Sequence, residues 1–343
     1  MLPGIKIGNL FKAFLMTQSI YYETLAASVR TEKASQNCYM PKMRAYLVLW
    51  CMFMLSTACQ RASSPEQAGT PNPEEHAAGV EAWHEQRIVS LMDDRGWLKL
   101  AGLYWLDNGV HSFGSAAEND IVMPQEAIPG FAGDITRQGN MITVDPAEDE
   151  MLLVNNEALI GSITFPVQNS LEFTHGRLAF QFIERGDLIG LRLYDEESAL
   201  SRNFEGINRF PVSLEYKVEA RLVPHDPPRK LPIVNMIGQT DMRETPGTLE
   251  FELGGVSHEL TPLSASDGER LFIIIADQTN GESTFGGGRF LYADNPGPGE
   301  TVILDFNKVY NPPCAFSEYT TCPLPPPENR LSVALESGEK RYN

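Results

Sequence analysis

The polar side chains that could do chemistry gather in the C-terminal part of the chain, within and just before an irregular, proline-rich segment. Guanidinium groups bind anions in a bidentate manner, and amide and phenol groups add directional hydrogen bonds. We therefore expect a pocket for a carboxylate, a phosphate or a sugar. The candidate ligand-binding residues are Arg289, Asp305, Asn307, Tyr310, Asn311 and Arg330, with Glu282 as a further member.

The same residues allow a second interpretation, in which they brace the irregular segment. A proline-broken loop leaves many backbone N–H and C=O groups outside regular ladders, and buried backbone groups need partners. Side chains of Arg, Asn and Asp can supply those partners. The sequence leaves the binding and bracing interpretations both open.

Catalysis is less well supported by the sequence than binding. A hydrolase needs a nucleophile, a base and a group that orients the base. The C-terminal segment offers Asp305, Glu282 and Cys314 but no histidine, and no Gly-x-Ser-x-Gly motif occurs in the chain. We expect a non-catalytic binding module for a small polar ligand, a glycan or a protein partner. The alternative is a hydrolase that acts on an ester or a glycan.

No metal or other cofactor is expected from the motifs. The chain has no Cys-x-x-Cys, no His-x-x-x-His and no aspartate-rich calcium loop. Cys314 and Cys322 are separated by seven residues and have no histidine nearby. In an oxidising compartment we expect them to form a disulfide, which would stabilise the fold by roughly 2 to 3 kcal/mol.

The N-terminal part of the chain predicts that the protein is located in the cell envelope. Residues 40–58 have the basic start, short apolar core and small-residue exit of a signal peptide. The apolar run of 14 residues from Ala45 to Ala58 is shorter than the about 20 that a membrane-spanning helix needs. Cys59 follows Thr-Ala and precedes a polar linker, so this stretch resembles a bacterial lipoprotein signal, although Ser56 stands where such signals usually have leucine.

The resemblance to a lipoprotein signal implies that lipid on Cys59 anchors the protein to the membrane, with the protein facing the periplasm or the exterior. Secretion with cleavage near Ala58 is the alternative. Residues 1–39 lack the features of a signal and are interpreted as an upstream extension. A small molecule or another envelope protein is the expected partner.

The charge of the chain excludes nucleic acid as a partner. The chain carries 27 Lys+Arg against 45 Asp+Glu, a formal net charge of −18. Such a surface repels phosphate backbones and anionic membrane surfaces. Membrane attachment would therefore come from lipid and not from a basic patch.

The spacing of apolar residues predicts one amphipathic helix followed by β-strands. Apolar positions recur at helical spacing from Glu74 to Asp94, and Gly96 ends the pattern. Short apolar runs then alternate with turn residues every eight to twelve positions, which is typical of an antiparallel sandwich or barrel. The expected organisation is a linker over residues 59–76, a helix and sandwich over 77–205, and a second β domain over 206–343. The expected strands are 98–106, 141–144, 171–173, 178–183, 188–194, 214–222, 231–236, 248–253, 271–276, 289–292 and 301–306.

The first β region resembles a forkhead-associated sandwich. The similar stretches are Gly109 to Gly114, Asn119 to Val122, and Leu152 to Asn156. That family reads phosphothreonine with an arginine after the glycine, where this chain has Ser115, and with a Ser-x-x-His that this chain lacks. The resemblance therefore implies a fold and speaks against phosphopeptide binding.

A larger part of the chain resembles the DUF1684 family of uncharacterised bacterial and archaeal proteins. The resemblance covers roughly residues 80–343. It is carried by the Gly96-Trp97-Leu98 stretch with its following apolar residues, by Gly281 to Arg289, and by the run from Leu304 to Lys340. It implies neither a reaction nor a substrate.

Overall fold

The described part of the chain starts with one long helix. The computed structural model describes residues 72–148 and 151–342. Helix α2 (Pro73–Met92) starts where the side chain of Asn72 accepts a hydrogen bond from the backbone N–H of Glu74, at 3.1 Å. An Asn cap followed by Pro at the first helical position is a favourable start. The predicted amphipathic helix is confirmed, with Val80, His84 and Leu91 on its buried face.

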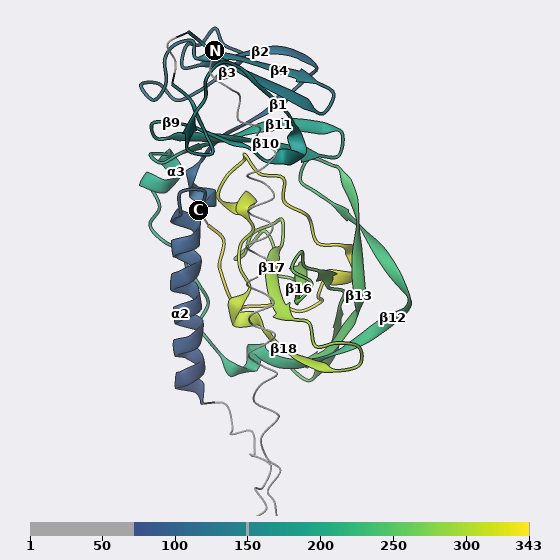
Figure 1. The fold of residues 1–343 in the computed structure, drawn as a ribbon. Helices are drawn as coiled ribbons and strands as arrows, with labels where there is room; N and C mark the ends of the chain where they lie inside the picture. Colours follow the sequence, from purple (N-terminus) through teal and green to yellow (C-terminus); the bar gives the residue numbers. More distant parts are fainter. Residues whose placement is uncertain (1–71, 149–150, 343) are drawn as a thin grey trace, which may run out of the picture. The chain divides into compact units, whose positions relative to one another are not determined.

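Eleven short strands after the helix form two sheets. One sheet has the order β1-β11-β10-β9-β6-β7 and the other β3-β2-β4-β5-β8, and all their pairings are antiparallel except that of β2 with β3. Figure 1 shows these strands in blue to teal. The strands are β1 (Leu100–Leu106), β2 (Gly109–Gly114), β3 (Ile121–Val122), β4 (Gly133–Gln138), β5 (Met141–Pro146), β6 (Leu153–Val154), β7 (Glu157–Ala158), β8 (Ile163–Pro166), β9 (Glu172–His175), β10 (Leu178–Arg185) and β11 (Leu188–Asp195).

The two sheets stack as a sandwich over a core of aromatic and aliphatic side chains. Phe113 and Ile135 come from one sheet and Phe173 and Phe180 from the other, and all four are buried in one cluster. The rings of Phe173 and Phe180 are stacked with centroids 5.1 Å apart. The predicted mainly β, antiparallel fold is therefore confirmed. We call β1–β11 the sandwich.

Seven further strands form two more antiparallel sheets. Their orders are β14-β13-β12-β18 and β15-β16-β17. We call residues 206–342, which contain these strands, the C-terminal region. The strands are β12 (Lys217–Val234), β13 (Thr240–Leu253), β14 (Val256–Leu260), β15 (Leu263–Ser264), β16 (Arg270–Ile275), β17 (Arg289–Asp294) and β18 (Thr301–Asp305).

The prediction of separate strands at 214–222 and 231–236 is wrong. The structure joins them into the single strand β12, which pairs with β13 in a long hairpin. The register shifts between Pro224 and Arg229, where four residues of β12 are skipped. Proline cannot donate to a ladder and so favours irregular positions. Pro227 and Pro228 lie in the skipped stretch, which the sequence predicted as a break.

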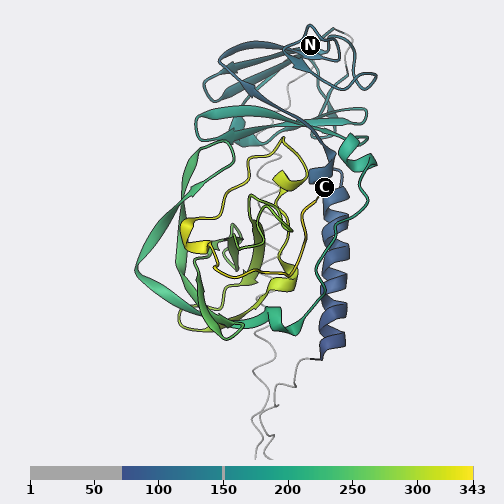
Figure 2. The same ribbon diagram turned by 180° about the vertical axis from the view of Figure 1, so that it is seen from behind.

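Short helices and extended segments complete the chain. Figures 1 and 2 show the yellow segment after β18 running between helix α2 and the β12–β13 hairpin. Its backbone is fixed at several places, for example by a bridge between Ala276 and Arg330. The short helices are η1 (Trp97–Lys99), η2 (Val167–Asn169), α3 (Ala199–Arg202), η3 (Leu214–Tyr216), η4 (Phe306–Lys308), η5 (Pro313–Ala315) and η6 (Pro327–Asn329).

Some predictions are not tested by this part of the chain. The predicted signal peptide, Cys59 and most of the predicted linker lie outside the described residues. The described residues belong to one compact unit, and the division at residues 205 and 206 stays a prediction. Within the described ranges, no helix is long and apolar enough to cross a membrane.

Candidate functional site

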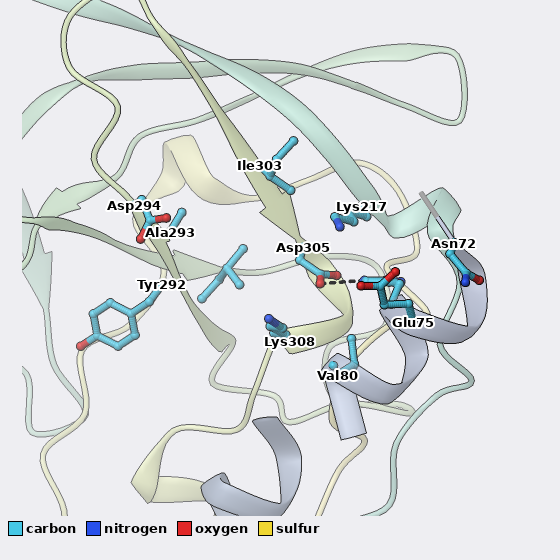
Figure 3. Close-up of a pocket in the computed structure, with 13 residues that line it drawn as sticks. Asn72, Glu75, Val80, Lys217, Tyr292, Ala293, Asp294, Ile303, Asp305 and Lys308 are labelled. Atoms are coloured by element: carbon cyan, nitrogen blue, oxygen red, sulfur yellow. Dashed lines mark hydrogen bonds and ion pairs between the residues drawn. The ribbon is translucent and has the colours of Figure 1, made fainter. Parts of the chain in front are cut away.

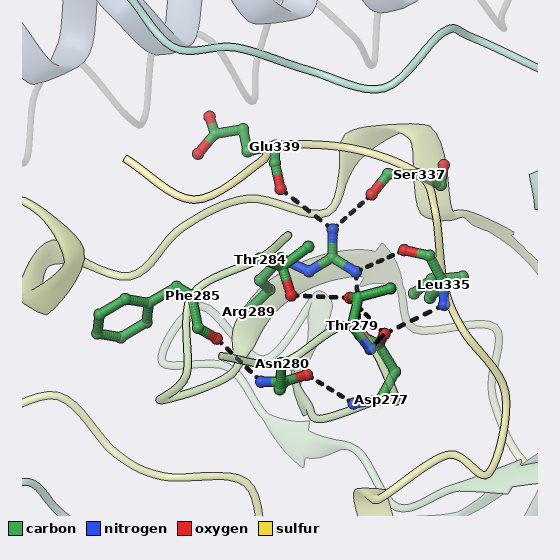
Figure 4. A network of polar contacts seen from close by, with 9 residues as sticks. All are labelled: Asp277, Thr279, Asn280, Thr284, Phe285, Arg289, Leu335, Ser337 and Glu339. Atoms are coloured by element: carbon green, nitrogen blue, oxygen red, sulfur yellow. Dashed lines mark hydrogen bonds and ion pairs between the residues drawn. The ribbon is translucent and has the colours of Figure 1, made fainter. Parts of the chain in front are cut away.

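Arg289, the first of the predicted ligand-binding residues, is buried in a polar network (Figure 4). Its side chain is 1% exposed. It donates hydrogen bonds to the carbonyl oxygens of Leu335 at 2.8 Å, Ser337 at 2.5 Å and Glu339 at 3.1 Å. A fourth bond reaches Asp277 Oδ2 at 3.0 Å. Arg289 therefore fixes the last segment of the chain, as the bracing interpretation predicts.

Asp277 is the partner that the sequence did not single out. Its Oδ1 accepts from the backbone N–H of Thr279 at 2.8 Å, the Thr279 hydroxyl at 2.6 Å and the Leu335 N–H at 3.1 Å. Burial lowers the pKa of Arg289, and the carboxylate of Asp277 acts in the opposite direction. The pair thus holds two opposite charges out of water, with hydrogen bonds to nearly every remaining polar atom.

Asn307 and Asn311 are also used inside the protein. Asn307 exchanges two hydrogen bonds with the backbone of Ser213, each 2.9 Å. The Asn311 side-chain amide donates to the Lys340 carbonyl at 2.7 Å, and its backbone N–H donates to the carboxylate of Glu339 at 2.7 Å. Both residues are almost fully buried. They brace the backbone of Ser213 and of Lys340.

Tyr310 lies beneath helix α2. The guanidinium of Arg87 is 4.5 Å from the centre of its ring, and the ring of Trp83 is 6.2 Å away. Burial raises the pKa of the Tyr310 hydroxyl well above its ordinary value. Arg87 also donates to the Asn311 carbonyl at 2.8 Å and pairs with Glu339 at 3.3 Å. Tyr310 therefore serves as a docking surface for the helix.

Arg330 and Glu282 lie at the surface. Arg330 is exposed at the rim of a cavity of about 290 Å³, beside Gly286 and Pro325. Glu282 is exposed on the glycine-rich turn before β17. That turn is closely approached by other backbone, as expected, since a Cβ at Gly288 would lie 2.8 Å from the Ile275 carbonyl oxygen, and its φ is +88°.

Asp305 lies in a larger cavity, which we call the α2–β18 pocket (Figure 3). Its volume is about 720 Å³. Helix α2 forms one side, and strands β17 and β18 with the start of β12 form the other. The lining residues are Asn72, Glu75, His76, Gly79, Val80, Lys217, Leu291, Tyr292, Ala293, Asp294, Ile303, Asp305 and Lys308.

The carboxylate of Asp305 is held from two sides. His76 Nε2, on helix α2, is 2.8 Å from Asp305 Oδ2. The Asn307 side-chain amide and backbone N–H donate to Oδ1 at 2.8 Å and 3.2 Å. These contacts fix the carboxylate and join helix α2 to the end of β18.

Two lysines of the α2–β18 pocket remain without a carboxylate partner in the described part of the chain. Lys217 lies directly opposite Asp305 in the β12–β18 ladder, a position where side chains usually interact. Among the described residues Asp305 forms no ion pair with Lys217, and its carboxylate contacts His76 and Asn307. Lys308, in η4, likewise forms no ion pair with any residue of the ranges 72–148 and 151–342. Figure 3 shows both lysines among the residues that line the pocket with Asp305.

Cys314 and Cys322 lie at disulfide distance, with their sulfur atoms 2.22 Å apart. The backbone N–H of Cys314 points to Cys322 Sγ at 3.1 Å, and that of Cys322 to Cys314 Sγ at 3.2 Å. The pair closes the loop that the sequence singled out. Among the described residues, no group of three His, Cys, Asp or Glu side chains is placed to hold a metal ion.

The comparisons with known proteins assign a family. The model of DUF1684, a family of proteins of unknown function, matches residues 202–340. A solved structure of an uncharacterised protein from Haloarcula marismortui is 32% identical, over 40% of this chain and 78% of that one, with a TM-score of 0.35. Residues 202–340 therefore belong to the DUF1684 family. No curated protein matches the chain.

Proposed function

We propose that this member of the DUF1684 family is a non-catalytic binding module whose ligand site is the α2–β18 pocket. The ligand is a small polar molecule with a carboxylate or phosphate group that is bound by Lys217 and Lys308. The volume of about 720 Å³ suits a small molecule. Of the six residues predicted to bind ligand, only Asp305 lies in this pocket.

The observation that carries the proposal is the unpaired state of the two lysines. Lys217 and Lys308 are partly buried, and both line the pocket. The Asp305 carboxylate that could neutralise Lys217 is held by His76 and Asn307. An anionic group of a ligand would fill that role.

The remaining walls of the pocket suit the rest of such a ligand. Val80, Leu291 and Ile303 provide apolar surface. Glu75 and Asp294 are exposed at the same pocket and disfavour ligands with several negative charges. A ligand with one anionic group and an apolar part satisfies both features.

The geometry supports binding better than the hydrolase alternative. The carboxylate of Asp305 accepts hydrogen bonds at both oxygens, so it is a poor base for an incoming water. The Nδ1 atom of His76 is shielded from solvent. Cys314, at disulfide distance from Cys322, offers no thiolate.

The same proposal places the module at the cell envelope. The short apolar run and Cys59 support a lipid anchor on that cysteine. Metabolic labelling with a radioactive fatty acid should mark the wild-type chain and not Cys59→Ser. Equal labelling of the two proteins would refute lipidation of Cys59 and would favour secretion without a lipid anchor.

Substitution of the two lysines tests the binding proposal. The double variant Lys217→Gln/Lys308→Gln should bind its anionic ligand at least about thirtyfold more weakly, since each of the two charged hydrogen bonds contributes about 1 kcal/mol or more. Calorimetric titration with a panel of monocarboxylates and phosphate monoesters measures the change. Lys230→Gln is the matched control, because Lys230 lies on the same strand but pairs with Glu244 outside the pocket. Equal affinities of the double variant and the control would refute the proposal.

A further inference from the structure

A smaller cavity lies at the glycine-rich turn before β17. Its volume is about 290 Å³, and we call it the Arg330 pocket. Its walls come from the turn that follows β16, from Gly286 and Gly287, and from the proline-rich segment around Pro325 and Arg330. It shares no residue with the α2–β18 pocket, so an inference about it does not depend on the function proposed above.

The backbone on either side of Arg330 is fixed, while its side chain is free. The Ala276 N–H donates to the Asn329 carbonyl at 2.9 Å, and the Leu331 N–H donates to the Ala276 carbonyl at 2.8 Å. The Arg330 side chain is exposed at the cavity and forms no hydrogen bond or ion pair with another residue of the ranges 72–148 and 151–342. Its guanidinium N–H groups therefore remain available to a ligand.

Within the described residues, no carboxylate neutralises Arg330. Asp277 lines the cavity, but its Oδ2 accepts from Arg289 at 3.0 Å and its Oδ1 accepts from the Leu335 N–H at 3.1 Å. Since Arg289 balances the charge of Asp277, the charge left at the wall is that of Arg330. The Arg330 pocket therefore favours an anion.

Two exposed acids near the cavity limit the charge of that anion. Glu282 lies on the glycine-rich turn and Glu328 lies two residues before Arg330, and neither lines the cavity. Both disfavour a ligand with several negative charges. A phosphate monoester carries nearly two charges at neutral pH, so a single carboxylate is the better fit.

The turn at residues 285–288 presents further donors. The Gly288 N–H donates to the Phe285 carbonyl at 3.2 Å, and the Asn280 side-chain amide donates to the same carbonyl at 2.9 Å (Figure 4). The backbone N–H groups of Gly286 and Gly287 donate to no residue in the part of the chain that the structure describes. Successive N–H groups in a turn can bind the oxygen atoms of an anion.

The volume and the remaining walls limit the rest of the ligand. Leu324, Pro325 and Leu331 provide apolar surface. The volume lies at the lower end of the range of about 300 to 1,000 Å³ that is usual for ligand pockets. The cavity therefore suits a carboxylate that carries a short apolar chain.

We propose that the Arg330 pocket binds a monocarboxylate with a short apolar chain. The Arg330 guanidinium binds the carboxylate through two parallel hydrogen bonds. The N–H groups of Gly286 and Gly287 donate to oxygen atoms of the same ligand, and its apolar chain lies against Leu324 and Pro325. A free short-chain acid and the C-terminal residue of a peptide both have this chemistry.

The test follows the Gly286 amide by NMR in the full chain labelled with ¹⁵N-glycine. Its resonance is identified by its absence from the spectrum of Gly286→Ala. A Cβ at this position would lie 3.7 Å from Gly281 Cα, an ordinary contact distance, so this variant keeps the fold. The probes are butyrate, the neutral butyramide, inorganic phosphate, and an acetylated Ala-Ala-Val peptide with a free or an amidated C-terminus.

Butyrate should shift the Gly286 resonance in a saturable manner, and butyramide should not. Arg330→Gln should weaken butyrate binding about tenfold, and Arg330→Lys, which keeps the charge but not the forked geometry, should weaken it less. Arg243→Gln is the matched control and should bind like the wild type, because Arg243 is exposed on β13 outside both cavities.

Two further comparisons separate the sites and the sources of the carboxylate. Lys217→Gln/Lys308→Gln should leave the Gly286 shift unchanged, so a failure of the α2–β18 proposal can be told from a failure of this one. Tighter binding of the free peptide than of butyrate would identify a peptide C-terminus as the ligand, and the reverse would identify a free acid. Both results support the inference.

Three results would overturn the inference. Equal carboxylate binding by wild type and Arg330→Gln would place the carboxylate elsewhere on the protein. A shift with phosphate and with no carboxylate probe would make the cavity a site for another class of anion. No shift with any probe would leave Arg330 as a solvated surface residue.

Discussion

The sandwich and the C-terminal region reach a packed state in different ways. The sandwich core is made of aromatic rings and aliphatic side chains, including the stacked pair Phe173 and Phe180. The C-terminal region also has an apolar core, but among the described residues it buries many more polar side chains. Arg289, Asp277 and Asn311 are examples that are almost fully buried.

The difference follows from regularity of the backbone. Ladders satisfy most backbone groups of the sandwich, so its interior can be apolar. The segment after β18 has little regular structure, and side chains must supply its hydrogen bonds. The α2–β18 pocket lies between helix α2 and strands β12, β17 and β18, and only Lys308 comes from the segment after β18. Dense polar motifs in the sequence thus marked the brace, and the open cavity lies beside it.

Removal of Arg289 should produce the largest loss of stability. Arg289→Met would leave Asp277 charged and buried, and three carbonyl groups would lose their donor. We expect a loss of about 3 to 5 kcal/mol in the free energy of unfolding, measured by urea denaturation. Arg330→Met, at an exposed position nearby, should change it by less than about 0.5 kcal/mol. Similar values for the two variants would contradict a bracing role.

Loss of the disulfide should have the next largest effect. Cys314→Ser should lower the free energy of unfolding by about 2 to 3 kcal/mol, because the unfolded chain gains freedom. It should also make Cys322 reactive toward thiol reagents. Residues 77–205 contain no cysteine, so hydrogen exchange should quicken in the loop between the two cysteines and not in the sandwich. Equal thiol labelling of wild type and variant would argue against the disulfide.

Acid should weaken the attachment of helix α2 through His84. Burial and Arg209 lower its pKa from 6.5 to about 4, with Arg87 acting in the same direction and Glu81 opposing. The unfolded chain therefore binds a proton before the folded one does. The free energy of unfolding should fall by about 2 kcal/mol as the pH drops from 6.5 toward 4. His84→Gln should flatten this part of the pH profile, and an unchanged slope would contradict the assignment.

The smallest effect is expected in the sandwich. Phe180→Leu removes part of a stacked ring that is 1% exposed and should cost about 1 kcal/mol in thermal or urea unfolding. Binding at the α2–β18 pocket should stay at the wild-type level. A loss of binding in this variant would show that the sandwich and the C-terminal region are coupled more closely than the comparison implies.

The fold was largely predictable because apolar periodicity determines it. The helix over residues 74–94 and the expected strands 178–183 and 188–194 correspond to α2, β10 and β11. The exception is β12, where Pro227 and Pro228 indicate a break. The partner strand β13 continues the ladder beyond the skipped residues, and that pairing is not visible in local sequence.

The site was only partly predictable because it depends on tertiary contacts. An arginine such as Arg289 has the same chemistry whether it binds a ligand or a backbone carbonyl. Its role was decided by the approach of residues 335–339, which no motif encodes. His76 lies 229 residues before Asp305. Sequence reasoning restricted to the C-terminal segment could not find it, or Lys217 on the neighbouring strand.

The most direct test of the proposed function is native mass spectrometry of the protein purified gently from cells. The wild-type chain should carry a bound small molecule, and Lys217→Gln/Lys308→Gln purified in parallel should lose it. Lys230→Gln should retain it. A bound mass that is present equally in all three proteins, or absent from all three, would contradict the account of the α2–β18 pocket as a ligand site.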